Sequence, residues 1–296
     1  MEKDVAVLIL GANVGSYAAC RSFYTEFGIQ PTVLDSQIPP LLRTSRFLRA
    51  RAVSSFDLAF PSLCLRILED EREALGKRVL LLPATPAYAD FLLKEEAHLS
   101  PLFLLPLGKA PSLPYGEGAG LPTGRLFAFL DARTARYCYA ETPLYCGERP
   151  AFYRTKSLPL SLLSFCEGLK EKAKGIFTFP VWEKEGDFQI GAPSSDLSSL
   201  PFFATAADVS PAELLLFCHV LCAAPSEASF APDGVYRILP RRQILRLLKN
   251  SEVRADFLSL CKRGWEIGLL DGKSEGLSPK GFFARRRAAR DYGAES

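Results

Sequence analysis

The stretch Val5-Ala-Val-Leu-Ile-Leu10, followed directly by Gly11-Ala-Asn-Val-Gly15, decides the fold class of this chain. An unbroken apolar run of this length is typical of a strand buried on both faces of a parallel sheet. Gly11 ends the run, and apolar side chains then recur at helical spacing over residues 14–27. Gly28 follows as the expected helix cap. The chain is therefore predicted to begin with a strand–turn–helix unit.

The alternation of strands and helices continues to residue 108. The predicted elements are, in order, a strand at 31–35, a helix at 62–75 with Ser62 as N-cap, a strand at 78–82, a helix at 85–98 and a strand at 102–105. Strands that alternate with helices of this length imply right-handed βαβ units. Residues 1–108 are therefore predicted to form a Rossmann-like α/β domain with a parallel sheet.

The alternation breaks at residues 106–124, the Pro/Gly stretch, which holds four prolines and five glycines. We interpret residues 109–124 as a linker or mobile loop. The elements expected after it are a hairpin at 125–130 and 135–139, a helix at 161–174, a hairpin at 176–182 and 187–190, a helix capped by Ser210, a strand at 234–239, and helices at 241–250 and 251–263. Residues 125–232 are thus predicted to be a reduced α+β domain, and residues 233–296 a helical, basic extension.

Composition narrows the class of protein. With 296 residues, 48% hydrophobic and 23% charged, the chain is long enough for about two globular domains. The longest nearly apolar run, residues 212–224, is shorter than the roughly 20 residues of a membrane-spanning helix. The N-terminus has neither the basic start nor the cleavage site of a secretory signal. A cytoplasmic protein without a transmembrane segment is expected, with its eight cysteines reduced.

Two clusters of residues could in principle bind a metal ion or an anionic polymer, but a structural role explains each of them more simply. Cys218, His219 and Cys222 lie on one predicted helix, with the two cysteines expected on the same face. A zinc site would need further ligands, and His98 is the only other histidine, so core packing is favoured. The basic end, with Arg285–Arg287 and Arg290 beside Phe282-Phe283, could attract an anionic polymer. A solvated terminal helix is favoured instead, and nucleic acid is not expected as a partner.

The turn after the first strand is the candidate binding site. Gly11, Asn13 and Gly15 precede a helix whose amides could hold a phosphate, and Asp35, about 20 residues on, could hold a ribose. Asn13, however, replaces the middle glycine of the dinucleotide pattern, and its side chain obstructs the approach of a pyrophosphate. A nucleotide or dinucleotide site and a purely structural tight turn both remain open.

Several segments resemble one family in their order along the chain. They are residues 7–29, 78–93, 99–103, 130–133 and 234–241. Together they resemble ATP-grasp carboxylate–amine ligases of the D-aspartate ligase type. The resemblance implies a pre-ATP-grasp domain followed by an ATP-grasp domain, and ATP and magnesium as cofactors. In such ligases a carboxylate and ATP form an acyl phosphate, from which an amine displaces phosphate.

The residues that the resemblance would assign to this chemistry are replaced. The lobe with the lysines that grip the nucleotide should lie between residues 105 and 125, where only the Pro/Gly stretch stands. Gln189 stands in the place of a metal-ligand glutamate, Gly191 in that of an asparagine, and Pro180 in that of a second metal-ligand acid. None offers magnesium a carboxylate. No catalytic or metal-binding residue is therefore assigned.

The sequence thus predicts an ATP-grasp homologue that is catalytically inactive, a pseudoenzyme. It would bind a small-molecule ligand, a partner protein or a second copy of itself. Two alternatives stay open. One is an active ATP-dependent ligase completed by another subunit, and the other is a nucleotide- or dinucleotide-binding module.

Overall fold

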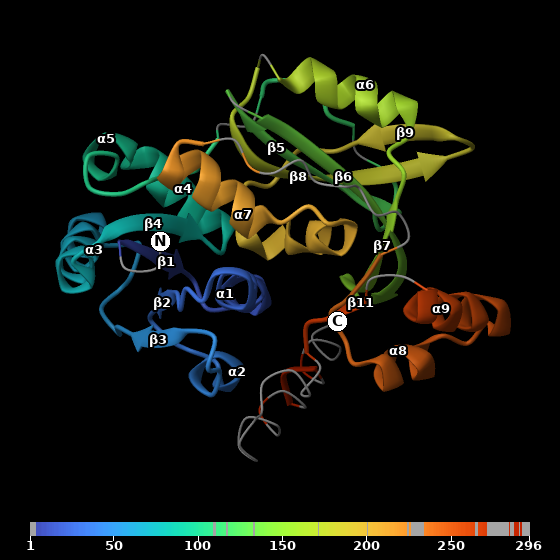
Figure 1. Cartoon of the computed structure of the whole chain (residues 1–296), viewed down its shortest axis with the longest axis horizontal. Helices are drawn as coiled ribbons and strands as arrows, with labels where there is room; N and C mark the ends of the chain where they lie inside the picture. Colours follow the sequence, from blue (N-terminus) through green and yellow to red (C-terminus); the bar gives the residue numbers. More distant parts are fainter. Residues whose placement is uncertain are drawn as a thin grey trace.

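The chain folds around two β-sheets (Figure 1). The computed structural model describes residues 4–270, apart from 109, 110, 117, 133, 171, 200, 224, 226–233, 264 and 265, and also residues 284, 287–289 and 291. A four-stranded sheet has the order β3-β2-β1-β4, and a seven-stranded sheet has the order β11-β10-β7-β6-β5-β8-β9.

The four-stranded sheet is parallel throughout, as predicted. Its strands are β1 (Val5–Leu10), β2 (Thr32–Asp35), β3 (Arg49–Ala52) and β4 (Arg78–Pro83). The predicted strand at 102–105 is wrong, because this segment makes only an isolated bridge from Leu104 to Leu80 beside β4. The opposite edge of the sheet is formed by β3, which the hydrophobic pattern missed because all four of its residues are exposed.

The helices of this half are α1 (Val14–Phe27), α2 (Pro40–Arg43), α3 (Pro61–Leu75), α4 (Pro86–Lys94) and α5 (Glu96–Leu99). The prediction for α1 is confirmed, and Gly28 caps it with a left-handed φ of 68°. Ser62 is not the N-cap of α3; Phe60 holds that position, and Pro61 starts the helix. The predicted helix at 85–98 is two helices that meet at Glu95.

The second sheet is antiparallel except at one edge. Its strands are β5 (Gly124–Asp131), β6 (Thr134–Cys146), β7 (Arg149–Lys156), β8 (Gly175–Lys184), β9 (Asp187–Ile190), β10 (Val235–Arg237) and β11 (Glu266–Gly268). Both predicted hairpins are confirmed. The predicted strand at 234–239 is confirmed as β10, which pairs antiparallel with β7. The segment after residue 233 also holds β11, which was not predicted and which pairs parallel with β10.

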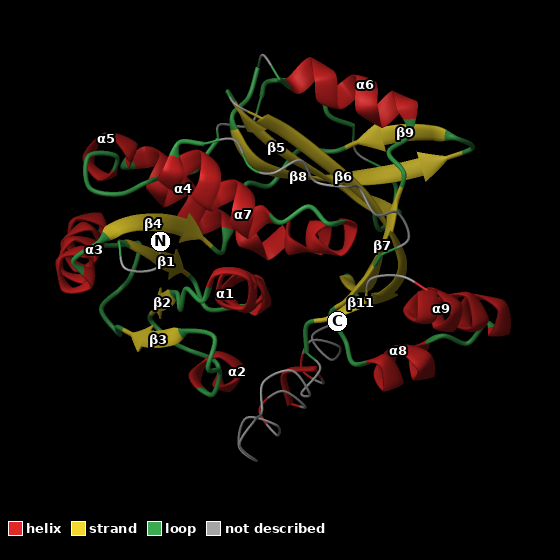
Figure 2. Ribbon diagram, viewed as in Figure 1, coloured by secondary structure: helices red, strands yellow, loops and turns green. Residues whose placement is uncertain are grey.

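The remaining helices cover the second sheet and fill the space between the sheets (Figure 2). They are α6 (Leu160–Leu169), the 3₁₀ helices η1 (Leu197–Ser199) and η2 (Pro201–Ala207), α7 (Pro211–Leu215), the π-helix η3 (Leu216–Leu221), α8 (Arg241–Leu247) and α9 (Ser251–Arg263). The helix predicted at 161–174 ends at Leu169. The Ser210 hydroxyl caps α7 by accepting from the amide of Glu213, as predicted.

One hydrophobic core joins the two sheets. Val7 and Ile9 of β1 belong to the same buried cluster as Phe127 and Phe129 of β5, with Phe202 of η2 also in it. A second cluster fills the other face of the four-stranded sheet, and a third lies between α6 and the seven-stranded sheet.

Among the described residues no single helix is long and apolar enough to cross a membrane. The apolar pair Pro201–Ala207 and Pro211–Leu221 is bent by 113°.

The Pro/Gly stretch packs onto the second sheet where it is described. Leu113 and Tyr115 pack against the cluster beneath α6. The amide of Gly116 donates to the Ile190 carbonyl of β9 over 2.9 Å, and the Trp182 indole donates to the Gly120 carbonyl over 3.0 Å. These contacts hold the described part of the stretch against β8 and β9.

The segment Cys218–Cys222 is part of the core at one end only. Cys218 is buried, whereas Cys222 is exposed at the left-handed end of η3. The expected shared face is therefore wrong, because the π-helical turn changes the spacing of side chains. The ring of His219 packs edge-on against Phe129, with centroids 6.2 Å apart.

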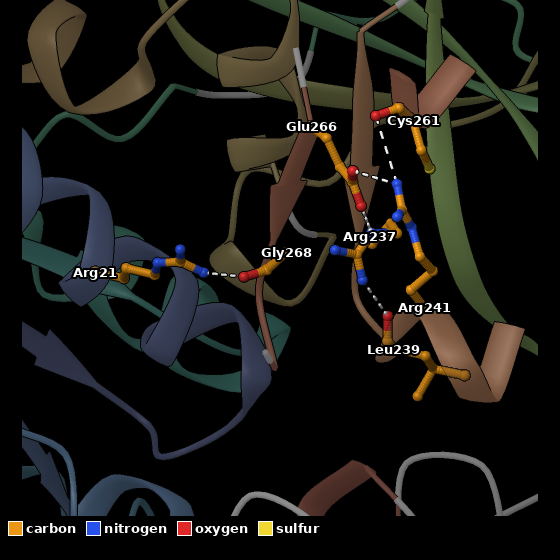
Figure 3. A network of polar contacts seen from close by, with 7 residues as sticks. All are labelled: Arg21, Arg237, Leu239, Arg241, Cys261, Glu266 and Gly268. Atoms are coloured by element: carbon orange, nitrogen blue, oxygen red, sulfur yellow. Dashed lines mark hydrogen bonds and ion pairs between the residues drawn. The ribbon is translucent and has the colours of Figure 1, made fainter. Parts of the chain in front are cut away.

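A polar network holds the C-terminal strands in place (Figure 3). Arg237, only 4% exposed, pairs with the Glu266 carboxylate, and Arg241 reaches the other oxygen of the same carboxylate at 2.9 Å. Arg21 of α1 donates to the carbonyls of Gly268 and Leu269. The network therefore joins β10, β11 and α8 to a helix of the other sheet.

We predict that Glu266→Ala lowers the free energy of unfolding by about 3–5 kcal/mol, because it leaves the buried Arg237 guanidinium without its carboxylate. Urea denaturation measures this. The matched control is Glu167→Ala, which removes a pair with Lys170 that is 44–49% exposed and should cost less than about 1 kcal/mol. Equal losses in the two variants would contradict the prediction.

The start of α1 makes a close contact with the other half of the chain. A Cβ atom at Gly15 would lie 2.0 Å from the Leu197 carbonyl oxygen of η1, which is shorter than any van der Waals contact. Only glycine lets the two backbones approach this closely.

We predict that Gly15→Ala lowers the free energy of unfolding by about 1–3 kcal/mol, because α1 or η1 must shift to make room for the methyl group. Gly168→Ala in α6 is the control. Its added methyl meets no atom within 4 Å, and alanine should raise stability by up to about 1 kcal/mol. Chemical denaturation compares the two, and an unchanged midpoint for Gly15→Ala would show that the contact is not tight.

Candidate functional site

A cavity of about 520 Å³ opens between the start of α1 and the second sheet. Its volume lies in the range of small-molecule sites. It is lined by the turn before and at the start of α1, by α2 and its preceding proline, by strands β5 and β7, by η1 and by the C-terminal segment. The lining residues are 12–15, 39–42, 125, 148–150, 153, 198, 199, 284, 287, 288 and 291.

Arg125 and Tyr153 form the polar part of the wall supplied by the sheet. Arg125 stands at the start of β5, and its buried Nε has no hydrogen-bond partner among the described residues. Tyr153 of β7 is 1% exposed, and its ring stacks on that of Phe203, with the ring centroids 4.8 Å apart. Burial raises the pKa of Tyr153 to about 12, against the opposing effect of the neighbouring Arg125 charge. The Tyr153 hydroxyl therefore stays protonated beside the Arg125 guanidinium.

The cavity carries a surplus of positive charge. Arg125, Arg149 and Arg287 line it, against two carboxylates, Glu148 and Asp291. Arg287 and Asp291 face each other at 3.6 Å across one turn of the C-terminal segment. Guanidinium groups bind carboxylate and phosphate with well-defined geometry. The charge of the cavity is therefore complementary to that of a small acidic molecule.

The four predicted site residues gather at the carboxyl ends of β1 and β2, and two of them line the cavity. Asn13 and Gly15 are among its walls, whereas Gly11 and Asp35 are not. Asn13 is the N-cap of α1, where its Oδ1 accepts from the Ser16 amide at 2.9 Å. Its Nδ2 donates to the Ala84 carbonyl after β4 at 2.6 Å. The Asn13 side chain therefore ties α1 to β4.

Gly11 and Asp35, the two predicted site residues that do not line the cavity, lie at the carboxyl ends of β1 and β2. Gly11 has a φ of 102°, which favours glycine. One oxygen of Asp35 accepts from the Ala12 amide at 2.7 Å, and the other accepts from the Tyr88 hydroxyl at 3.2 Å. Burial, followed by the Asp35 charge, raises the pKa of Tyr88, so this hydroxyl remains a donor. These contacts explain the structural role of the residues, and their role in holding a ligand stays a prediction.

The positions that the resemblance assigned to magnesium lie on the hairpin of β8 and β9. The Gly191 amide donates to the Pro180 carbonyl at 2.9 Å, and Gln189 is exposed opposite Trp182. In the described part of the chain, no three His, Cys, Asp or Glu side chains gather closely enough to hold a metal ion. Of the predicted basic tail, Arg287 is described; Arg285, Arg286, Arg290 and Phe282-Phe283 lie outside the described residues.

Sequence reasoning missed the residues that make the cavity charged. Arg125 directly precedes the apolar run Leu126–Leu130, and Tyr153 lies within an apolar pattern. A lone arginine at the start of a buried strand was the available signal. Arg149 gave none, and Arg287 was noted only as part of the basic end, because nothing in the local sequence indicates that the two meet across the fold.

Comparison with known proteins identifies the fold. No family model and no curated protein sequence matches the chain. Among solved structures, it is similar to a biotin carboxylase from Campylobacter jejuni in a complex with βγ-ATP (TM-score 0.51, 10% identity, covering 79% of this chain and 75% of that one). It is also similar to the biotin carboxylase subunit of a pyruvate carboxylase (TM-score 0.51, 9% identity, 78% and 73%).

A third similar structure is the urea carboxylase of Kluyveromyces lactis, with a TM-score of 0.50 and 11% identity. This chain spans only 23% of that protein, and 28% of a single-chain, multi-domain long-chain acyl-CoA carboxylase. Biotin carboxylases belong to the ATP-grasp superfamily. At such identities the likeness concerns the fold alone. The chain therefore has a mixed α/β architecture of the ATP-grasp type, with a parallel N-terminal sheet followed by a second, largely antiparallel sheet.

Proposed function

We propose that this chain is an ATP-grasp homologue that binds a small acidic molecule in the 520 Å³ cavity and performs no ATP-dependent ligation. The observation that carries the proposal is the surplus of guanidinium groups in a cavity between the two sheets. Arg125 would hold the acidic group of the ligand, with Tyr153 as its positioning residue.

Magnesium does not fit the residues that the resemblance assigns to it. Pro180 and Gly191 have no side-chain oxygen, and the Gln189 carbonyl is neutral. Mg²⁺ is bound in proteins chiefly through carboxylates and phosphate oxygens. The proposed function therefore involves neither magnesium nor ATP, and the relation to D-aspartate ligases is a resemblance only.

The Pro/Gly stretch supports the same conclusion. It stands where the lysine-bearing lobe of the resembling ligases would be, and its described part packs against β8 and β9. Gly116 and Gly118 lie so close to Gln189 and Trp182 that a Cβ atom would come within 2.4 Å and 2.1 Å of their side chains. A stretch in such contact leaves little room for a nucleotide against these two side chains.

We predict that inorganic phosphate or succinate, added in excess, raises the unfolding temperature of the full chain, because a ligand at 100 times its dissociation constant adds about 2.7 kcal/mol. Arg125→Met should weaken this binding about 10- to 100-fold, since it removes a charge-assisted hydrogen bond. Arg66→Met, which changes an exposed arginine of α3 outside the cavity, is the matched control. Calorimetric titration gives the affinities.

The same preparation should release no ADP from ATP and magnesium above the rate without protein. Magnesium-dependent ADP formation would overturn the inactive assignment even if the acidic ligand binds. Conversely, a protein that shows no ADP formation and no response to either anion would leave the fold intact but remove the proposed ligand.

A further inference from the structure

The sheets of this protein have four edges, and three of them are hydrogen-bonded by other parts of the chain. Beside β4, Leu104 donates to the Val79 carbonyl at 2.9 Å and accepts from the Leu81 amide at 3.0 Å. At β9, the Gly116 amide bonds to Ile190. At β11, the Arg21 side chain bonds to the Gly268 carbonyl. Unpaired edge groups are a template for another strand, and these contacts occupy part of each edge.

The fourth edge, β3, has no such contact among the described residues. The amides of Arg49 and Val53 donate to the carbonyls of Pro31 and Asp35, so these residues face β2. Backbone groups alternate sides along a strand, and those of Ala50 and Ala52 therefore face outward. Figure 1 shows β3 at the margin of its sheet, and all four of its residues are exposed.

This edge is strongly basic. Residues 36–56 contain four arginines, at 43, 46, 49 and 51, and no aspartate or glutamate. Arg51 pairs with Glu71 of α3 at 2.7 Å, and Arg49 bonds to the neutral Gln30 at 3.2 Å. Glu71 thus offsets the charge of Arg51, whereas Arg49 has a neutral partner, so the strand itself keeps a net positive charge. The outward positions carry the small side chains of Ala50 and Ala52, which leave the backbone accessible.

We propose that β3 pairs with an extended, acidic segment of a partner protein, which adds to the sheet as a fifth strand. Main-chain hydrogen bonds to Ala50 and Ala52 would hold the segment, and its carboxylates would meet the arginines. A second copy of this chain fits less well, because pairing β3 with itself would bring arginines together. The proposal is independent of the cavity and of its ligand.

The test uses the full chain and a fluorescent peptide of alternating valine and glutamate, with binding followed by anisotropy. The peptide should bind at about 50 mM salt and lose most of its affinity at about 500 mM, because the charges are exposed. The matching valine–lysine peptide should not bind. Ala50→Pro removes one outward amide while keeping the bonds of Arg49 and Val53 to β2, and it should weaken binding by about tenfold or more.

Arg49→Glu is the second variant, since it leaves the backbone groups unchanged. It should also weaken binding of the acidic peptide, whereas the control variant Arg66→Glu on α3 should not. An acidic peptide that fails to bind, or that binds Ala50→Pro and Arg49→Glu as tightly as the unchanged chain, overturns the proposal. So does a dimer in sedimentation velocity that Ala50→Pro dissociates, because the edge would then pair with a second copy.

Discussion

The close packing of α1 against η1 is the constraint on which the arrangement of the two sheets depends. Gly15 allows the backbone of Leu197 to come so near that no side chain could stand between them. Asn13 fixes the same end of α1 to the segment after β4. One helix start is thus attached to both halves of the chain, beside the core that Val7, Phe127 and Phe202 share.

That arrangement also determines where the charged cavity lies. The walls come from the start of α1, from β5 and β7, and from the C-terminal segment, which are brought together only by the docking of the sheets. Arg125 and Tyr153 lie together in this wall, where the guanidinium charge offsets part of the rise that burial causes in the pKa of Tyr153. A site built in this way is specific to the assembled fold and cannot be attributed to either sheet alone.

The sequence was informative where local patterns and tertiary structure agree. The run Val5–Leu10 and the helix 14–27 were predictable because an apolar strand, helical spacing of apolar side chains and a glycine C-cap all act within a few residues. The strand β3 was not, because Arg49-Ala-Arg-Ala52 has no apolar face and is ordered by pairing with β2. The apolar run at 102–105 suggested a strand, yet its packing beside β4 supplies only one bridge. Charged cavity residues such as Arg149 and Arg287 are separated by more than a hundred positions, and no local pattern links them.

The position of β10 and β11 has a consequence for how the chain is made. These strands pair at the β7 edge, and Arg21 near the N-terminus bonds to Gly268, which is 247 residues later. Contacts so distant in sequence slow folding, because a long loop must close before they form. During synthesis β7 leaves the ribosome well before its neighbour β10, and its edge is then open to other chains. The chain therefore depends on its last strands for protection from aggregation as well as for stability.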